Sequence, residues 1–177
     1  SRALDELRRL LGEADTVTVR LGGREAVFEV ENVRLTTVLI EGEFPNYRQL
    51  IPTSYPNRLT LSRDALLDAI RRVRLLARDA VPVRLTMGPG VCELRAITQC
   101  LRAERRQVVG EAHEELDATY EGTELTVAFN PEFLATGVEA VTDDEVVIET
   151  LDTLKPALVR PAVAGDFLYL LMPVRVT

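Results

Sequence analysis

The feature that most constrains the fold is one order of elements that occurs three times, a short helix followed by strands. Apolar residues recur at helical spacing in 1–12, 62–79 and 130–141, so the helices begin roughly 60 to 70 residues apart. The third helix also has Asn130 as a good N-cap and Pro131 at its first position. The repeat predicts an α+β protein built from pseudo-symmetric units, each with a helix and an antiparallel sheet.

Strand candidates with alternating apolar and polar residues follow each helix. They are 16–20, 26–30 and 33–40 after the first helix, 81–87, 91–98 and 112–120 after the second, and 145–150, 156–163 and 167–175 after the third. A further strand, 123–129, precedes the third helix, and the stretch 39–52 is its expected counterpart before the second. Many α+β proteins place strands after a helix by chance, so the pattern alone leaves that alternative open.

Composition and charge narrow the class of protein. Hydrophobic residues make up 46% of the 177 residues and the net charge is −7, which favours a packed globular protein over one that holds nucleic acid by bulk attraction. The cysteines, Cys92 and Cys100, show no disulfide or zinc spacing, and the sequence has no signal peptide or long apolar span. We therefore expect a cytoplasmic protein, and one that begins inside a longer chain because Ser1 already lies in a helical pattern.

The second helix pattern segregates its arginines. At 100° per residue, Leu66, Ala69, Ile70, Val73 and Ala77 share the apolar side, and a sector of about 80° beside it holds Arg63, Arg71, Arg74 and Arg78. Such a sector is typical either of a surface that faces phosphates or of an ordinary solvated helix face. The residues alone leave both interpretations open.

Two segments carry apolar residues where a connector or a chain end is expected. The connector "LIEGEFPNYRQLIP" contains Pro45, Gln49 and Leu50, and the tail "YLLMPVRVT" runs from Leu170, Leu171 and Met172 into Pro173, Val174 and Arg175. Because proline cannot donate to a central ladder, the chain should leave the sheet at Pro173 or lie on its edge. Exposed apolar groups beyond that point indicate a binding surface, and the alternative is a terminal strand that completes the core.

The motifs "EGEFPNYRQLIP", "TVAFNPEFL" and "FLYLLMPVR", in this order, closely resemble the bacterial sliding clamp, the beta subunit of DNA polymerase III. The resemblance runs over most of the chain and implies about one and a half clamp domains. Residues 1–54 would be the second half of the middle domain and 57–177 the third domain. It also implies a head-to-tail dimeric ring that encircles duplex DNA, with helices lining the hole and sheets outside.

The resemblance implies three sets of site residues. The pocket for short peptides from the polymerase, the clamp loader and repair polymerases would be lined by Pro45, Gln49, Leu50, Asn130, Phe133, Ala157, Leu170, Leu171, Met172, Pro173, Val174 and Arg175. Gln49 stands where the family commonly has arginine, and Phe133 where it has tyrosine. The surface facing DNA would hold Arg2, Arg63, Arg71, Arg74 and Arg78, and the subunit interface Leu75 and Leu76, for which burial at the helix end is the alternative.

No catalytic, metal or cofactor site is expected. The only histidine, His113, lies among glutamates in a predicted surface strand, and the acidic runs lack metal-ligand spacing along the chain. We therefore expect a non-catalytic processivity factor, with polymerase activity in partner subunits. The alternative function is a stand-alone peptide-binding module that does not encircle DNA. Residues 99–110 exceed the family's usual connection and are either a basic loop or a reading-frame artefact.

Overall fold

The computed structural model describes residues 2–12, 14–44, 46–52, 54–76, 81–102, 105–163, 165 and 167–175, without the side chains of 76, 98–102, 105–107 and 109. The chain divides into two compact units, Ser1–Asn46 and Tyr47–Thr177. The division falls between Asn46 and Tyr47, whereas the sequence analysis placed it after residue 54.

The first unit is one helix with a three-stranded antiparallel sheet. Its elements are α1 (Arg2–Leu11), β1 (Thr18–Leu21), β2 (Glu25–Val30) and β3 (Val33–Val38), in the sheet order β1-β2-β3. Only Ala26, Val27 and Val30 are buried among its described hydrophobic residues, and α1 buries none. A single small sheet with one helix cannot enclose a full core. Large apolar side chains therefore stay exposed, namely Leu4, Val17, Val19, Leu21, Val33, Val38, Leu39, Ile40 and Phe44.

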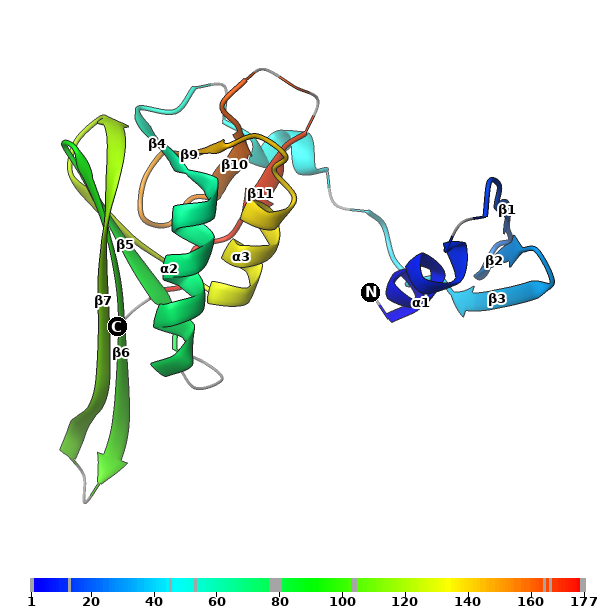
Figure 1. Cartoon of the computed structure of the whole chain (residues 1–177), viewed down its shortest axis with the longest axis horizontal. Coiled ribbons are helices and arrows are strands. Elements are labelled where there is room, and N and C mark those ends of the chain that lie inside the picture. Colours follow the sequence, from blue (N-terminus) through cyan, green and yellow to red (C-terminus); the bar gives the residue numbers. More distant parts are fainter. Residues whose placement is uncertain are drawn as a thin grey trace. The chain divides into compact units, whose positions relative to one another are not determined.

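The second unit combines two α-helices with eight strands. It begins with the 3-10 turn η1 (Tyr47–Leu50), and continues with β4 (Asn57–Ser62), α2 (Arg63–Leu76), β5 (Val83–Gly88), β6 (Val91–Arg102), β7 (Arg105–Glu121), β8 (Leu125–Phe129), α3 (Pro131–Glu139), β9 (Glu145–Thr150), β10 (Ala157–Pro161) and β11 (Tyr169–Leu171). The helices α2 and α3 lie side by side against the sheet (Figure 1). None of the described helices is long and apolar enough to span a membrane.

The sheet of the second unit is antiparallel throughout, in the order β11-β10-β9-β4-β7-β6-β5-β8. Two halves repeat the order strand, helix, three strands: β4-α2-β5-β6-β7 and β8-α3-β9-β10-β11. The first strand of each half pairs with the other half, because β4 pairs with β9 as well as with β7 of its own half, and β8 pairs with β5. This exchange confirms the predicted pseudo-symmetric units and shows that the two halves share one sheet.

One core fills the second unit between the helices and the sheet. Leu66, Ala69, Ile70 and Val73 of α2 are buried as predicted, Leu67 is buried as well, and Ala77 lies outside the described residues. Facing strands contribute alternating residues such as Leu59, Leu85, Leu94, Val127, Phe129, Ile148 and Val159. The α3 start is also as predicted, because the Asn130 side chain accepts hydrogen bonds from the backbone N–H groups of Glu132 and Phe133.

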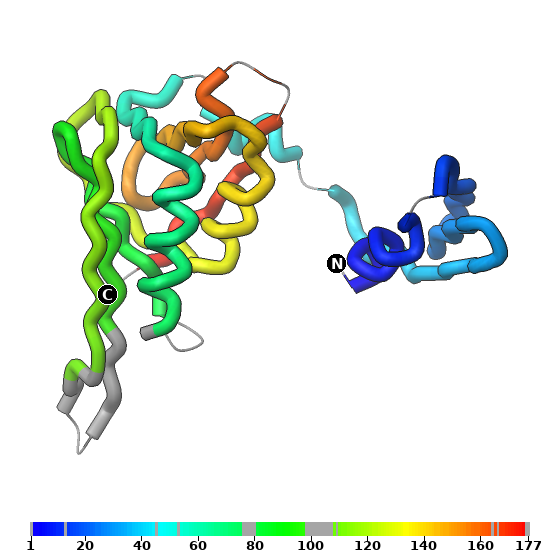
Figure 2. Tube along the Cα trace, in the orientation of Figure 1, coloured from blue at the N-terminus to red at the C-terminus, as the bar shows by residue number. Residues whose placement is uncertain are grey.

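Two predictions about strands are corrected by the structure. The strand before α2 is Asn57–Ser62, which the sequence analysis did not identify, and not the connector 39–52. Of the segment 99–110, expected as a loop or an artefact, residues 99–102 and 105–110 extend the ladder of β6 and β7 instead, with an irregularity between Thr98 and Gln99, and 103–104 lie outside the described residues. β6 and β7 therefore run side by side as a long hairpin (Figure 2).

Candidate functional site

The segment after β11 crosses to the opposite edge of the sheet. β11 ends at Leu171, and the chain leaves the ladder with β10 before Pro173, as predicted. The backbone N–H of Val174 then donates to the carbonyl of Ala128 in β8 at 2.7 Å. The tail therefore joins β8, the edge strand at the opposite end of the sheet from β11.

This crossing encloses one side of a pocket of about 450 Å³. Its lining comes from four segments: Arg84 of β5, Thr126 and Ala128 of β8, Thr153 and Leu154 of the β9–β10 loop, and Val174 and Arg175 of the tail. Arg84 and Ala128 are direct cross-strand partners, so they share one face of the sheet. Thr126 on the same face is fixed by a hydrogen bond of 3.0 Å between its hydroxyl and that of Thr86.

The β9–β10 loop holds Leu154 at this pocket through Asp152. One carboxylate oxygen of Asp152 accepts hydrogen bonds from the backbone N–H groups of Leu154 at 2.7 Å and Lys155 at 2.8 Å. The bond from Leu154, and after it the bond from Lys155, lowers the pKa of Asp152. The carboxylate therefore stays ionised and holds the backbone of this turn. Leu154 itself is 58% exposed and offers an apolar surface.

The charge at the pocket is positive and unneutralised. Neither Arg84 nor Arg175 makes an ion pair with any residue that the structure describes. By contrast, Arg58, Arg63, Arg71, Arg72, Arg74, Arg95 and Arg160 of the same unit all pair with carboxylates. A pocket with apolar walls of Leu154 and Val174 and two available guanidinium groups suits a segment that carries an apolar and an acidic group.

The predicted peptide-site residues divide into three groups in the structure. Leu50, Phe133, Met172, Val174 and Arg175 are exposed, as is Gln49, and Leu170, Pro173 and Asn130 are partly buried. Ala157 and Leu171 are buried in the core at 0% and 2% exposure, so their side chains offer no surface in this unit. Pro45 lies outside the described residues.

Of the predicted set, the structure brings only Val174 and Arg175 into the pocket described above. Asn130 has a structural task, because its side-chain oxygen caps α3. The sequence analysis missed Arg84, Thr126, Ala128, Thr153 and Leu154. Alternation of Arg84 with buried Val83 and Leu85 could have shown its outward face, but nothing local indicated that the tail and the loop would meet there.

The predicted DNA-facing arginines of α2 form hydrogen bonds and ion pairs with groups of the protein itself. Arg63 is 26% exposed at its side chain, and its Nε donates to the carbonyl of Val141 at 2.6 Å while a terminal nitrogen donates to that of Glu139 at 3.1 Å. These carbonyls lie at and just beyond the C-terminal end of α3. Arg63 therefore ties the start of α2 to the end of α3, a role that the sequence did not indicate.

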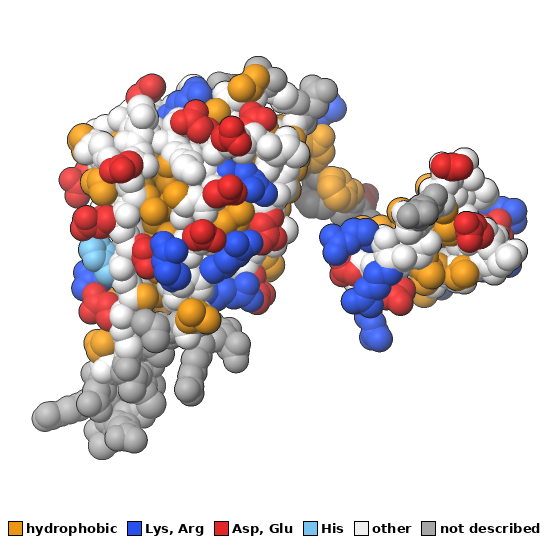
Figure 3. All heavy atoms as spheres, in the orientation of Figure 1, with side chains coloured by type: hydrophobic (Ala, Val, Ile, Leu, Met, Phe, Trp, Pro, Cys, Tyr) orange, Lys and Arg blue, Asp and Glu red, His pale blue; other side chains and the backbone are white. Residues whose placement is uncertain are grey.

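The other arginines of α2 lie on the surface in ion pairs. Arg71 pairs with Asp68 at 3.1 Å and Glu139 at 3.7 Å, Arg74 pairs with Glu132, and Arg72 makes two bonds to Glu114 of β7 at 2.8 and 2.9 Å. Figure 3 shows basic and acidic side chains interspersed over this face. Exposed pairs of this kind contribute little to stability, about 0–1 kcal/mol, so a phosphate could replace a carboxylate partner at small cost.

Within the described residues of α2 and α3, the charges of this face balance. Four arginines of α2 are balanced by Asp64 and Asp68 of α2 and Glu132 and Glu139 of α3. Arg2 is exposed on α1 of the first unit, and Arg78 lies outside the described residues. Leu75 is 83% exposed, so it is not buried at the helix end within this unit, whereas the side chain of Leu76 is not among those described.

Comparison with known proteins identifies the family of this chain. Residues 48–175 match the family model described as DNA polymerase III beta subunit, C-terminal domain. The chain belongs to the DNA polymerase III beta subunit family. This confirms the resemblance inferred from the three motifs, and the clamp fold with it.

Relatives of known sequence and structure match both units of this beta-subunit chain. It is 33% identical to the beta sliding clamp of Streptomyces coelicolor over 188 residues, which covers 100% of this chain and 48% of that protein. The sliding clamp of Bartonella birtlesii, solved bound to griselimycin, is 31% identical with a TM-score of 0.79, covering 99% of this chain and 46% of that one. The Caulobacter crescentus clamp, with polyethylene glycol at its proposed beta-motif tethering region, is 29% identical with a TM-score of 0.79. The chain spans about half the length of these relatives.

Proposed function

We propose that this chain is the C-terminal part of a sliding clamp, a non-catalytic processivity factor that encircles duplex DNA and tethers polymerases in the cytoplasm. The observation that carries the proposal is the likeness to the Bartonella birtlesii sliding clamp over 99% of the chain. On this proposal, 57–177 is the third clamp domain and 1–54 the second half of the middle domain. The polymerase activity belongs to partner subunits.

The exposed apolar surface of the first unit supports this assignment. One helix and three strands leave nine large apolar side chains exposed, and both sheet edges, β1 and β3, are unpaired within the described residues of the unit. In the second unit, a complete core needs two such halves. Residues 1–46 would therefore complete their core against another helix-and-sheet half, as in the middle domain of a longer clamp.

The tethering surface is supported by the tail. Met172 is 59% exposed directly before Pro173, and the pocket containing Val174 and Arg175 follows. A flexible methionine beside apolar and cationic groups suits short linear peptides from several partners, such as a replicative polymerase, a clamp loader and repair polymerases. The Caulobacter clamp carries polyethylene glycol at a region proposed for tethering such motifs, which agrees with this use.

Fluorescence anisotropy with a labelled clamp-binding peptide of a replicative polymerase tests the tethering role. Met172→Ala should weaken binding by about 1 kcal/mol or more, because an exposed anchor is lost. Leu75→Ala is the matched control, since Leu75 is also exposed but lies on α2. Absence of saturable binding by the folded chain, or equal binding by both variants, would contradict the proposed tethering surface.

The same titration can test whether Arg84 extends this surface. We expect Arg84→Ala to weaken binding of a peptide with an acidic residue beside its apolar anchor, and to leave the corresponding amide peptide unaffected. The reason is that Arg84 is an unpaired cation at the pocket in the described structure. Equal losses for both peptides would show that Arg84 acts only through packing.

A second candidate function is a peptide-binding module that does not encircle DNA. The charge balance between α2 and α3 favours it, because the described residues of these two helices carry no net positive charge that would attract phosphates. Retention on circular compared with linearised plasmid, measured by gel filtration, distinguishes the two. If the protein co-elutes with circular plasmid and not with linearised plasmid, encirclement is supported. If it elutes as free protein in both cases, the peptide-binding module is supported.

A further inference from the structure

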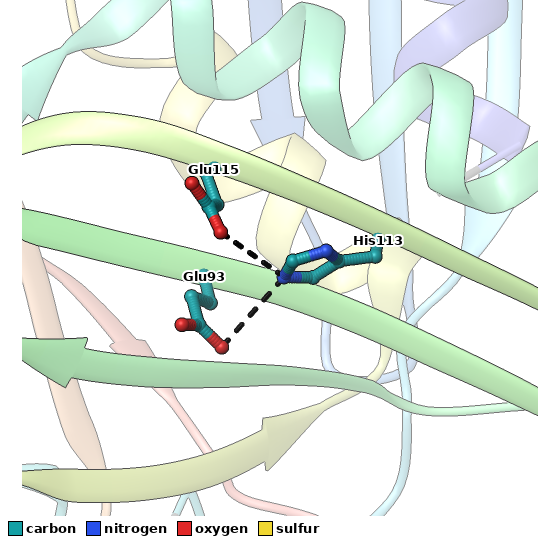
Figure 4. Close-up of side chains that lie close together, drawn as sticks. All are labelled: Glu93, His113 and Glu115. Atoms are coloured by element: carbon teal, nitrogen blue, oxygen red, sulfur yellow. Dashed lines mark ion pairs between the residues drawn. The ribbon is translucent and has the colours of Figure 1, made fainter.

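Three side chains with metal-binding atoms meet on the outer face of the β6–β7 hairpin. Glu93 of β6 and Glu115 of β7 are direct cross-strand partners, and His113 lies two residues from Glu115 on the same face. The Nε2 atom of His113 lies 3.7 Å from a carboxylate oxygen of Glu93 and 3.9 Å from one of Glu115. Figure 4 shows both carboxylates pointing toward this nitrogen.

The two carboxylates face each other without a permanent cation between them. Like charges directly opposite on neighbouring strands destabilise a sheet pair. The basic residue across from His113 is Arg95, but Arg95 pairs with Glu111. In the described part of the chain, Glu93 and Glu115 have no ion-pair partner other than His113. This arrangement leaves a concentrated negative charge beside a nitrogen donor.

The donor set of one imidazole and two carboxylates selects a particular class of ion. Imidazole nitrogen favours zinc and neighbouring first-row metals, whereas oxygen-only sites favour magnesium and calcium. The three ligand atoms lie within 4.8 Å of one another. Tetrahedral zinc with bonds of 2.0–2.1 Å needs ligand separations of about 3.3 Å, so small rotations of exposed side chains suffice.

We propose that Glu93, His113 and Glu115 form a binding site for one divalent first-row transition metal, with zinc as the representative ion. Three protein ligands leave a coordination position open to water or to a ligand from a partner. The ion would link β6 to β7 and neutralise the cross-strand pair. The site was not predicted because its ligands come from two strands, and their spacing is visible only in the paired sheet.

Isothermal titration calorimetry with zinc chloride tests the site on the full chain without a histidine tag. Cys100→Ser serves as the common background, because a second thiol could also bind zinc. We expect one zinc per chain, binding weakened at least about tenfold by His113→Gln and by the double variant Glu93→Gln with Glu115→Gln, and no comparable binding of magnesium. Glu124→Gln, an exposed carboxylate change near β8, is the matched control and should bind like the background chain.

Proton NMR gives a second readout, because His113 is the only histidine and its ring signals need no assignment. Zinc should shift these signals in the background chain and in Glu124→Gln. Circular dichroism confirms that each exposed variant is folded. The proposal is overturned if zinc leaves the ring signals unchanged, if all variants bind zinc equally, or if magnesium binds as tightly as zinc.

Discussion

Arg63 offers the sharpest test of the difference between a DNA-facing and a structural arginine. Its guanidinium donates to the carbonyls of Val141 and Glu139 at the end of α3. Hydrogen bonds from charged groups contribute about 1.5–3 kcal/mol each in favourable cases. Partial exposure reduces this contribution. Removing a cation from the start of α2 also stabilises that helix by about 0.3–1 kcal/mol, because the N-terminal end of the helix dipole is positive. We therefore expect Arg63→Ala to lower the free energy of unfolding by about 2 kcal/mol.

Urea unfolding followed by tyrosine fluorescence measures this change in the second unit alone. The chain has no tryptophan, and its four tyrosines, Tyr47, Tyr55, Tyr120 and Tyr169, all lie in residues 47–177. Arg71→Ala is the control, because its pairs are exposed and should be worth less than about 1 kcal/mol. A loss for Arg63→Ala no larger than that for Arg71→Ala would refute the structural role. Arg63→Lys should also be destabilised, since one ammonium group cannot span both carbonyls as the fork does.

Three further predictions concern stability and reactivity. Gly122→Ala should destabilise the second unit by about 1–3 kcal/mol in urea unfolding, because φ is +135° and a Cβ would collide with the Asn57 side chain. Arg72 holds the pKa of Glu114 below its usual range through their hydrogen bonds, so the associated stability is present above the unfolded pKa and disappears as pH falls through the folded value. Glu114→Gln should therefore lose less stability than wild type between about pH 5 and 3 in acid titrations. Burial raises the pKa of Cys92 to about 12, so its thiol should react with a disulfide reagent at pH 8 only after unfolding.

Matched variants make these outcomes decisive. Gly88→Ala should cost less than Gly122→Ala, since a Cβ at Gly88 meets nothing within 4 Å and its φ is ordinary. Glu124→Gln is the matched control for the acid titration, and a loss of stability on acidification that is the same in Glu114→Gln as in the unsubstituted chain would contradict the role of Arg72. The thiol assay requires the Cys100→Ser background, and fast labelling of Cys92 in the folded chain would show that its strand opens.

The sequence predicted elements whose periodicity is local, and missed those defined by distant partners. The buried face of α2 followed from helical spacing, and the exit at Pro173 followed from its missing N–H. Strand β4 was missed because "NRLTLS" is short and directly abuts a helix, and its state is fixed by pairing with β7 and β9 on both sides. Tertiary pairing here overrides a weak local signal.

The candidate site shows the same limit. Motifs located Val174 and Arg175 in the tail, because neighbouring residues in sequence stay neighbours in space. Arg84 and Leu154 reach the same pocket from segments far apart in the chain. Likewise, the arginine sector of α2 was predicted by angle, but the carboxylates that pair with its described arginines come from α3 as well as from α2. The angle of 100° per residue predicts which side chains share a helix face, but it does not predict which groups from other elements pair with them.

The exchange of strands β4 and β8 between the two halves has a consequence for how the second unit forms. Neither half can complete its sheet until the other has been synthesised. For example, Asn57 of β4 pairs with Thr150 of β9, and its side-chain amide donates to the Thr150 carbonyl. Such distant pairings favour slow, all-or-none folding with no stable half-folded species. They also mean that a single cut between β7 and β8, after Glu121 and before Leu125, would leave two fragments held together by strand pairs, because β4 pairs with β9 and β8 pairs with β5. Limited proteolysis should then nick the unit without releasing either piece until denaturant is added.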